Sequence, residues 1–198
     1  AAADWAGLEH DVLALAVDAA CVCFCGSLPP TESTEPFARL LRALVERGKA
    51  VWVDTSGAAL AAAGQTPGVT IKVNDREIGA LLRRRVETVP DAGAAAAALA
   101  QQMGAPVAVT LGSRGAVFAD GAAVYYAQPP KIKAISAVGS GDVFLAGLLL
   151  GLDQAHAPSE ALRMGAAAGA ANAMSAGGGQ FRISEYEQVL AETWAERL

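Results

Sequence analysis

The segment from Ser136 to Asp142, with the sequence SAVGSGD, joins three small residues to a carboxylate just before an apolar run. Small residues at Gly139, Ser140 and Gly141 let the backbone approach a ligand, and the helix start that follows leaves N–H groups unpaired. Such a turn can bind an anion, which the helix dipole also favours. Asp142 beside it could accept a proton from an attacking hydroxyl, as phosphoryl transfer requires. The same pattern also fits an ordinary helix with Asp142 in its first turn.

A second polar segment, KVNDRE, runs from Lys72 to Glu77 directly after an apolar stretch. At the end of a strand, the amide of Asn74 can donate and accept, and Glu77 stands one helical turn further on. Both side chains could therefore address one magnesium–phosphate group. The alternative is structural, because Asn74 as N-cap and Glu77 three residues later also form a capping box.

A third segment, TLGSRG, places Thr110, Gly112 and Gly115 between two apolar stretches. Its glycines could bring backbone close to a nucleotide, or they could simply make a turn. The sequence has no Walker A motif, no GxGxxG after a strand and no GxSxG. P-loop ATPases, Rossmann dehydrogenases and α/β-hydrolases are therefore disfavoured.

The elements that position these segments follow from apolar periodicity. Strands are predicted at 20–24, 50–53, 69–73 and 106–111, with a hairpin over 116–128 turning at Asp120-Gly121. Helices are predicted at 5–19, 35–47, up to about 64, 75–84, 91–103, after 139–141, 158–176 and 184–198. Apolar strands that alternate with helices predict one α/β domain over residues 1–198, with a mainly parallel sheet covered on both faces. The three polar segments should then meet at one rim, beyond the carboxyl ends of the strands.

Composition narrows the classes of protein further. Of 198 residues, 53% are hydrophobic and 18% charged, which excludes disorder as the main state. The net charge of −5 argues against a nucleic-acid partner. No basic n-region of a signal peptide opens the sequence, and the longest apolar run, Val143 to Leu152, is about half of a bilayer span. We expect a cytoplasmic protein without a membrane partner.

The three cysteines, Cys21, Cys23 and Cys25, are an odd number at a spacing of two residues. This spacing matches neither the CxxC zinc pattern nor a disulfide framework. Alternate residues of a strand share a face, so we expect all three to lie on one packed side of a buried strand. Such free thiols also indicate a reducing compartment.

Taken in order from about residue 20 to 178, the segments resemble the motifs of the ribokinase-like (PfkB-type) carbohydrate kinases. In this sequence, CGSLPP at 25–30 is similar to the family motif SGSLPPG, and VDTSG at 53–57 to the family motif VDTSG. KVN at 72–74 with Glu77 is similar to KPNxxE, and TLGSRG at 110–115 to TxGxxG. SAVGSGD at 136–142 is similar to STVGAGD. The last motif is typical of the 1-phosphofructokinase/tagatose-6-phosphate kinase branch.

The resemblance implies a three-layer α-β-α fold and a role for each matching residue. Asp142 would be the base, and the amides of Gly139, Ser140 and Gly141 would form the anion hole. Ser27 would face the sugar, and Glu77 would help to organise Mg²⁺. The residues implied to bind ATP are Lys72, Asn74, Thr110, Leu111, Gly112, Gly115, Gly169 and Asn172.

The sequence departs from the family pattern in several places. Val73 replaces the proline of KPN, Thr31 replaces the glycine after the prolines, and Ala137 and Ser140 alter the last motif. Family members are also longer. The resemblance therefore implies the C-terminal ATP-binding portion of a kinase, with the N-terminal strands and the lid missing. A sheet cut at that side would expose a hydrophobic edge, so we expect the chain either to form a homo-oligomer or to be marginally stable.

The function implied is ATP- and Mg²⁺-dependent phosphoryl transfer to a hydroxyl of a phosphorylated ketohexose. Fructose 1-phosphate, fructose 6-phosphate and tagatose 6-phosphate are the candidate substrates. One alternative is a ribokinase- or nucleoside-type kinase, although these usually carry aspartate where this sequence has Ser136. A second alternative is a non-catalytic nucleotide-binding fragment.

Overall fold

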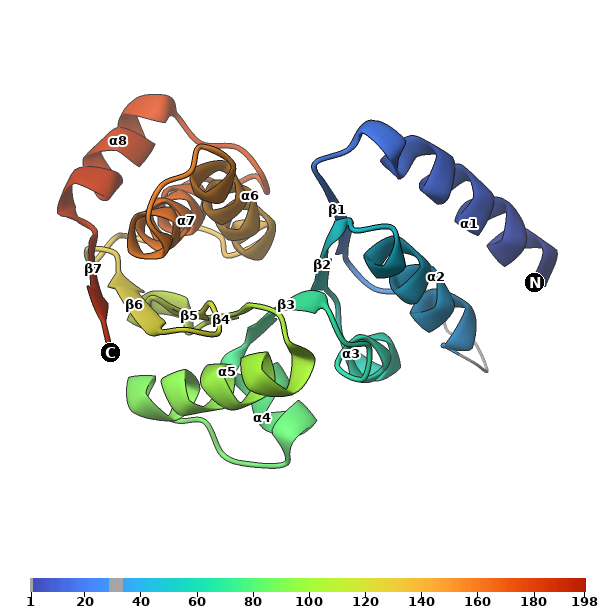
Figure 1. Ribbon diagram of the computed structural model, residues 1–198. Helices are drawn as coiled ribbons and strands as arrows, with labels where there is room; N and C mark the ends of the chain where they lie inside the picture. The colour runs from blue at the N-terminus through green and yellow to red at the C-terminus, as the bar shows by residue number, and fades with distance from the viewer. Residues whose placement is uncertain (1, 29–33) are drawn as a thin grey trace.

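A computed structural model describes residues 2–28 and 34–198 and contains a seven-stranded sheet whose strands lie side by side in sequence order (Figure 1). The strands are β1 (Cys21–Cys25), β2 (Ala50–Asp54), β3 (Val69–Asn74), β4 (Val107–Thr110), β5 (Ala116–Ala119), β6 (Val124–Gln128) and β7 (Trp194–Arg197). The strands from β1 to β4 pair in parallel, and those from β4 to β7 pair antiparallel. All four carboxyl ends of the parallel strands therefore meet at one edge.

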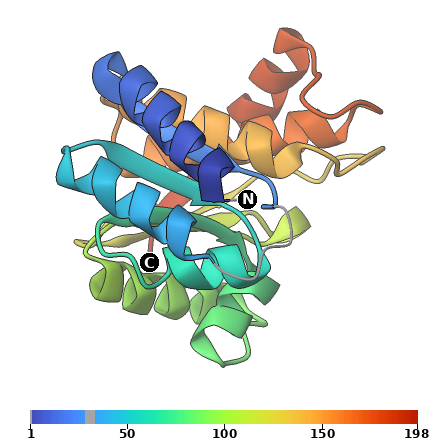
Figure 2. The same ribbon diagram turned by 90° about the vertical axis from the view of Figure 1, so that its right-hand side faces the viewer.

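Helices cover both faces of this sheet (Figures 1 and 2). They are α1 (Ala2–Leu15), α2 (Glu35–Glu46), α3 (Gly57–Ala63), α4 (Asp75–Leu82), α5 (Val89–Met103), α6 (Ser140–Asp153), α7 (Pro158–Ala173) and α8 (Ile183–Glu192), with short 3-10 turns η1 (Ala16–Asp18) and η2 (Gly112–Arg114). In the described ranges, no helix is long and apolar enough to cross a membrane. The three-layer α/β architecture is confirmed.

Alternation along the strands divides the core in two. One cluster contains Val51 and Val53 of β2 with the buried residues of α2 and α5. The other contains Trp52 with Phe118 and the buried residues of α6 and α7. Trp52 and Phe118 stack with ring centroids 6.5 Å apart. The parallel strands β2, β3 and β4 are thus covered on both sides, which explains their continuous apolar sequences.

Two predicted elements were wrong in detail at the antiparallel end of the sheet. The predicted helix over 184–198 stops at Glu192, and the residues after Thr193 form β7 instead. Pairing with β6 and an edge-on contact between Trp194 and Tyr126, with centroids 5.4 Å apart, favour the extended form there. The hairpin between β5 and β6 exists, but its loop is 120–123 rather than two residues.

The expectation that the cysteines are buried was also wrong. They do share one face of β1, opposite the side from which Phe24 packs on Phe37. Cys21 is half-buried against the α6–α7 cluster, whereas Cys23 and Cys25 are exposed. In the described part of the chain β1 is an edge strand, and the helices on that face lie over the inner strands. The homo-oligomer expected from such an edge stays a prediction.

Helices α6 and α7 pack through glycines that leave no room for a side chain. A Cβ at Gly151 would lie 2.6 Å from the Cα of Ala161, and one at Gly165 would lie 2.9 Å from the carbonyl oxygen of Phe144. The close approach lets α7 support α6 along its length. The position of the SAVGSGD segment therefore depends on this helix pair.

We expect Gly151→Ala to lower the free energy of unfolding by about 1–3 kcal/mol, because the new methyl group must displace α7. Gly7→Ala is the matched control, since a Cβ at Gly7 meets nothing within 4 Å. Both changes reduce the freedom of the unfolded chain equally, and the control should gain roughly 0.4–1 kcal/mol. Urea denaturation measures both. Equal stability of the two variants would contradict the packing argument.

Candidate active site

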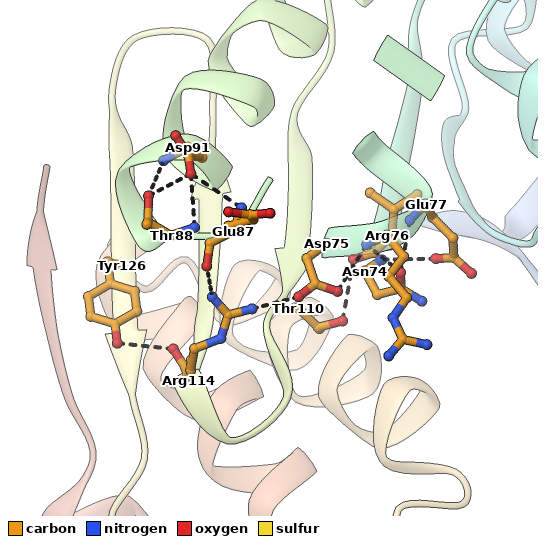
Figure 3. Close-up of polar contacts among 11 residues, drawn as sticks. Asn74, Asp75, Arg76, Glu77, Glu87, Thr88, Asp91, Thr110, Arg114 and Tyr126 are labelled. Carbon is orange, nitrogen blue, oxygen red and sulfur yellow. Dashed lines mark hydrogen bonds and ion pairs between the residues drawn. The ribbon is translucent and has the colours of Figure 1, made fainter. Parts of the chain in front are cut away.

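The polar segments predicted to share one rim do so. Cys25 is the register partner of Asp54, and Asn74 is the partner of Thr110. The hydroxyl of Thr110 donates to the carbonyl oxygen of Val73 at 3.3 Å, which ties the end of β4 to β3 (Figure 3). The carboxyl ends of the parallel strands thus form a continuous polar edge, on which the start of α6 rests.

The first turn of α6 is shaped by Gly139, its N-cap, whose φ of 74° is left-handed. A Cβ there would lie 3.0 Å from the Cα of Gly178, so only glycine fits. The amide of Ser140 donates to the carbonyl oxygen of Ala137 at 3.2 Å. Helix geometry leaves the amides of Gly141 and Asp142 without intrahelical acceptors. These two N–H groups are the ones best able to bind an anion.

Asn172 of α7 holds this turn in place and is fully buried. Its amide nitrogen donates to the carbonyl oxygen of Val138 at 2.9 Å and to Oγ of Ser140 at 3.0 Å. Its oxygen accepts from the amide of Gly179 at 2.8 Å. The side chain therefore connects α7, the start of α6 and the loop after α7. The structure thus gives Asn172 a positioning role, and its contact with adenine stays a prediction.

Beneath the same turn lies an ion pair between Lys72 of β3 and Asp54 of β2, with Nζ and Oδ2 2.7 Å apart. The two side chains are only 8% and 15% exposed. A Cβ at Gly141 would lie 2.6 Å from that Nζ. The backbone of α6 thus contacts a buried ammonium group. The turn therefore combines free amides with a positive charge below them.

Asp142 follows Gly141 and is exposed at the rim. Its carboxylate lies near enough to the thiol of Cys25 to affect the pKa of that thiol. Burial raises the pKa of Cys25, the carboxylates of Asp54 and Asp142 raise it further, and Lys72 opposes them. Cys25, Asp54 and Lys72 occupy equivalent faces of three adjacent strands, all directed toward α6. Four ionisable side chains therefore surround the start of this helix.

Asn74 and Glu77 form the capping box of α4. Oδ1 of Asn74 accepts from the amides of Arg76 at 3.0 Å and Glu77 at 2.9 Å. Oε2 of Glu77 accepts from the amide of Asn74 at 2.9 Å (Figure 3). The structural interpretation is confirmed. No group of three or more His, Cys, Asp or Glu side chains in the described ranges could hold a metal alone. Mg²⁺ is commonly held by one or two carboxylates plus substrate phosphates, so Glu77 fits such a role.

A cavity of about 560 Å³ lies beside the start of α6. It brings together six of the predicted residues, namely Thr110, Gly112, Gly115, Ser140, Gly141 and Gly169. Its remaining walls are mostly apolar and come from α7, the segment before α6, Ala116 and Phe144, with Ser113 and Lys131 as the polar members. Its volume is in the range of small-molecule and cofactor sites. Lys72, Asn74, Glu77, Leu111, Asp142 and Asn172 do not line it, and Ser27 is exposed after β1.

The loop on one side of this cavity depends on Gly115. Its φ is 80°, and a Cβ there would lie 2.0 Å from the carbonyl oxygen of Ala127. Its own carbonyl oxygen accepts from the amide of Leu111 at 2.8 Å, while the side chain of Leu111 is buried. TLGSRG is therefore a tight turn that presents its backbone to the cavity, consistent with both interpretations of the segment.

Two members of the site were missed by sequence reasoning. Asp54 lies in the VDTSG motif at a strand end, but the sequence predicts no role of its own for it. Its pairing with Lys72 depends on the register between β2 and β3. Cys25 was assigned to the core, although it immediately precedes the Gly26-Ser27 loop. The signal available for both was their position as the last residue of a strand. The prolines and Thr31 of the CGSLPP region lie outside the described residues.

The protein has the ribokinase-like kinase fold. Phosphofructokinase-2 from Escherichia coli, crystallised with substrates and products, superposes with a TM-score of 0.85 at 30% identity, over 94% of this chain and 61% of that one. The chain belongs to the pfkB family of carbohydrate kinases, whose family model matches residues 1–183.

Curated relatives agree with this assignment. The chain is 32% identical to 1-phosphofructokinase of Escherichia coli (strain K12) over 168 residues, which is 85% of this chain and 54% of the relative. It is 34% identical to ATP-dependent 6-phosphofructokinase isozyme 2 of the same organism over 172 residues, 86% of this chain and 55% of the relative. The chain thus spans about half the length of these relatives.

We expect the thiols of Cys23 and Cys25 to react slowly in spite of their exposure. Burial, followed by the adjacent Cys21 and Cys25, raises the pKa of Cys23 to about 12. At pH 8 the reactive thiolate is then about 10⁻⁴ of the total. Iodoacetamide labelling followed by fragmentation mass spectrometry should give a rate at Cys23 at least ~100-fold below that in the urea-unfolded chain, and the rate at Cys25 should also be lower than in the unfolded chain. Similar rates in both states would refute this environment.

Proposed function

We propose that this site transfers the γ-phosphoryl group of ATP to a hydroxyl of a phosphorylated ketohexose. The observation that carries the proposal is the start of α6, where the free amides of Gly141 and Asp142 lie above the Lys72–Asp54 pair. Fructose 1-phosphate, fructose 6-phosphate and tagatose 6-phosphate are the substrates proposed. Membership of the pfkB family supports this reaction class.

In the proposed mechanism, the carboxylate of Asp142 accepts the proton of the attacking hydroxyl. The amides of Gly141 and Asp142 donate to the transferring phosphoryl group, whose negative charge the dipole of α6 also stabilises. The ammonium of Lys72 adds a positive charge below the turn, and Asp54 fixes its position. Asn172 keeps these amides in place, so they need not reorganise during the reaction.

We propose that the cavity of about 560 Å³ holds the nucleotide. Its adenine would lie among the small residues of α7 around Gly169, and its phosphates would extend toward Gly141. Mg²⁺, when bound, neutralises phosphate charge, and the carboxylate of Glu77 would hold it at the end of β3. The oxygen of Asn74 already caps α4, so its side-chain NH₂ group would donate to a phosphate. Ser27 would contact the sugar phosphate from the end of β1.

Asp142→Asn should lower kcat by about 10²–10⁴, because the amide cannot accept the proton. Its affinity for a non-hydrolysable MgATP analogue should stay within about threefold, since binding itself requires no proton transfer. Asp153→Asn, at the other end of α6, is the matched control and should leave both values unchanged. A coupled ADP-release assay with the three ketohexose phosphates gives kcat. Unchanged turnover in Asp142→Asn would reject Asp142 as the base.

The same assay separates the alternatives. Turnover with ribose or a nucleoside instead of ketohexose phosphates would support a ribokinase- or nucleoside-type kinase. Saturable binding of the analogue without turnover of any sugar would support a non-catalytic nucleotide-binding module. A folded chain that binds no nucleotide would contradict the proposal as a whole.

Ala170→Leu should weaken binding of the MgATP analogue by at least ~10-fold, because the larger side chain occupies space in the cavity that Ala170 lines. The matched control is Ala146→Leu on the exposed face of α6, which should bind like the wild type. Calorimetric titration measures both. Equal affinities would show that the nucleotide binds elsewhere.

A further inference from the structure

A second hollow, shallow and widely open to solvent, lies away from the start of α6, along α4 and the segment that follows it, and has a volume of about 500 Å³. Arginines dominate its lining: Arg76, Arg83, Arg84 and Arg85. The proposed phosphoryl transfer uses none of them. Five of the 15 basic residues of this acidic chain, these four and Arg114, gather in this region. The sequence alone suggests only a solvated charge run at 83–85.

Two of these arginines stand at opposite ends of one helix face. Arg76 lies in the first turn of α4, and Arg83 is its C-cap. Seven residues of helix separate them by roughly 10 Å along the axis, and two full turns put them on the same side. Gly79 and Ala80 lie between them and also line the hollow. The hollow therefore has a floor of small residues with a guanidinium at each end.

The chain then folds back against this face. Arg83 is left-handed, with a φ of 52°, and the amide of Arg84 donates to the carbonyl oxygen of Gly79 at 3.0 Å. A Cβ at Gly79 would lie 2.9 Å from the carbonyl oxygen of Arg84, so a larger residue would push the segment away. The hydrogen bond to Gly79 and the close packing there keep Arg84 and Arg85 beside the hollow.

The positive charge is only partly compensated. Asp75 and Glu87 also line the hollow. Asp75 is paired with Arg114 at 2.6 Å, and Glu87 with Arg85 at 3.3 Å in an open position. Within residues 2–28 and 34–198, the guanidinium groups of Arg76 and Arg83 have neither an ion pair nor a hydrogen-bond acceptor. These two groups are free to receive a ligand.

We propose that this arginine hollow binds a small anion with two or more phosphoryl groups, one held near Arg76 and another near Arg83. Guanidinium groups recognise phosphoryl oxygens with paired, charge-assisted hydrogen bonds. A separation of roughly 10 Å between the two ends suits an extended ligand better than a single phosphate. A hexose bisphosphate and a linear triphosphate share this chemistry. The site goes beyond the proposed function and does not depend on it.

The arginine hollow is also connected to the loop beside the larger cavity. Arg114, from η2, donates to Oδ2 of Asp75 at 2.6 Å and to the carbonyl oxygen of Glu87 (Figure 3). Both acceptors belong to residues that line the hollow, while the neighbouring Gly112 and Gly115 line the cavity. A ligand that shifts Asp75 or Glu87 would therefore change the support of TLGSRG. We expect binding at the two sites to be coupled.

The test is a nitrogen-15 NMR titration of the 198-residue chain with tripolyphosphate and, separately, with fructose 1,6-bisphosphate. At least one probe should produce saturable shifts in the amides of 76–87, followed by those of 112–115. The double variant Arg76→Ala/Arg83→Gly should weaken this binding at least ~10-fold, because both free guanidinium groups are lost. Glycine at 83 suits the left-handed backbone, so the variant should retain the fold. Inorganic phosphate should bind at least ~10-fold more weakly than the better probe.

Arg47→Ala, which removes an exposed arginine at the end of α2, is the matched control and should bind like the wild type. Tighter binding of the bisphosphate would identify a sugar bisphosphate as the ligand class. Tighter binding of tripolyphosphate would identify a linear triphosphate, such as that of a nucleoside triphosphate. Equal affinity of the double variant and the wild type, or no shifts in 76–87, would overturn the proposal. Shifts confined to 139–142 would reject the arginine hollow and leave the proposed kinase site standing.

Discussion

The contact between the backbone of Gly141 and the ammonium group of Lys72 determines how the rest of the site is built. A Cβ at Gly141 would lie 2.6 Å from Nζ, so α6 can rest on the sheet only where it has no side chain. Asp54 in turn compensates the buried charge of Lys72. Because Asp54 ends β2 and Lys72 lies opposite it on β3, the pairing of these two strands also sets how far the first turn of α6 stands above the sheet.

Much of the fold can be predicted from the sequence because local and tertiary preferences agree there. Strands such as β2 are apolar on both faces, and each helix that follows has its own periodicity. Prediction failed at 184–198, where a helical pattern yields to pairing of Trp194 with β6. It failed again at Cys23, because burial depends on whether a strand lies at the edge of the sheet. The order of the strands in the sheet cannot be predicted from any local sequence pattern.

The same difference between local and distant interactions applies to the residues of the candidate site. Residues that act through their place at the end of a strand or the start of a helix, such as Asn74 and Gly141, can be found from sequence. A contact between residues distant in the sequence cannot be found in this way. Asp54 meets Lys72 across a strand pair, and the bonds from Asn172 to the turn before α6 come from α7. Motif resemblance identified Asn172 as important, but only its three hydrogen bonds show how it supports the turn.

The division of the core into two clusters has a consequence for synthesis of the chain on the ribosome. The buried members of the cluster under α2 and α5 lie between Ala16 and Tyr126, so this cluster can close once those residues have emerged. The other cluster needs Phe144 and Leu162, which follow later. Until then Trp52 and Phe118 form an uncovered apolar surface on a nascent sheet. Such exposed surface makes a partly folded chain prone to aggregation until α6 and α7 are complete and cover it.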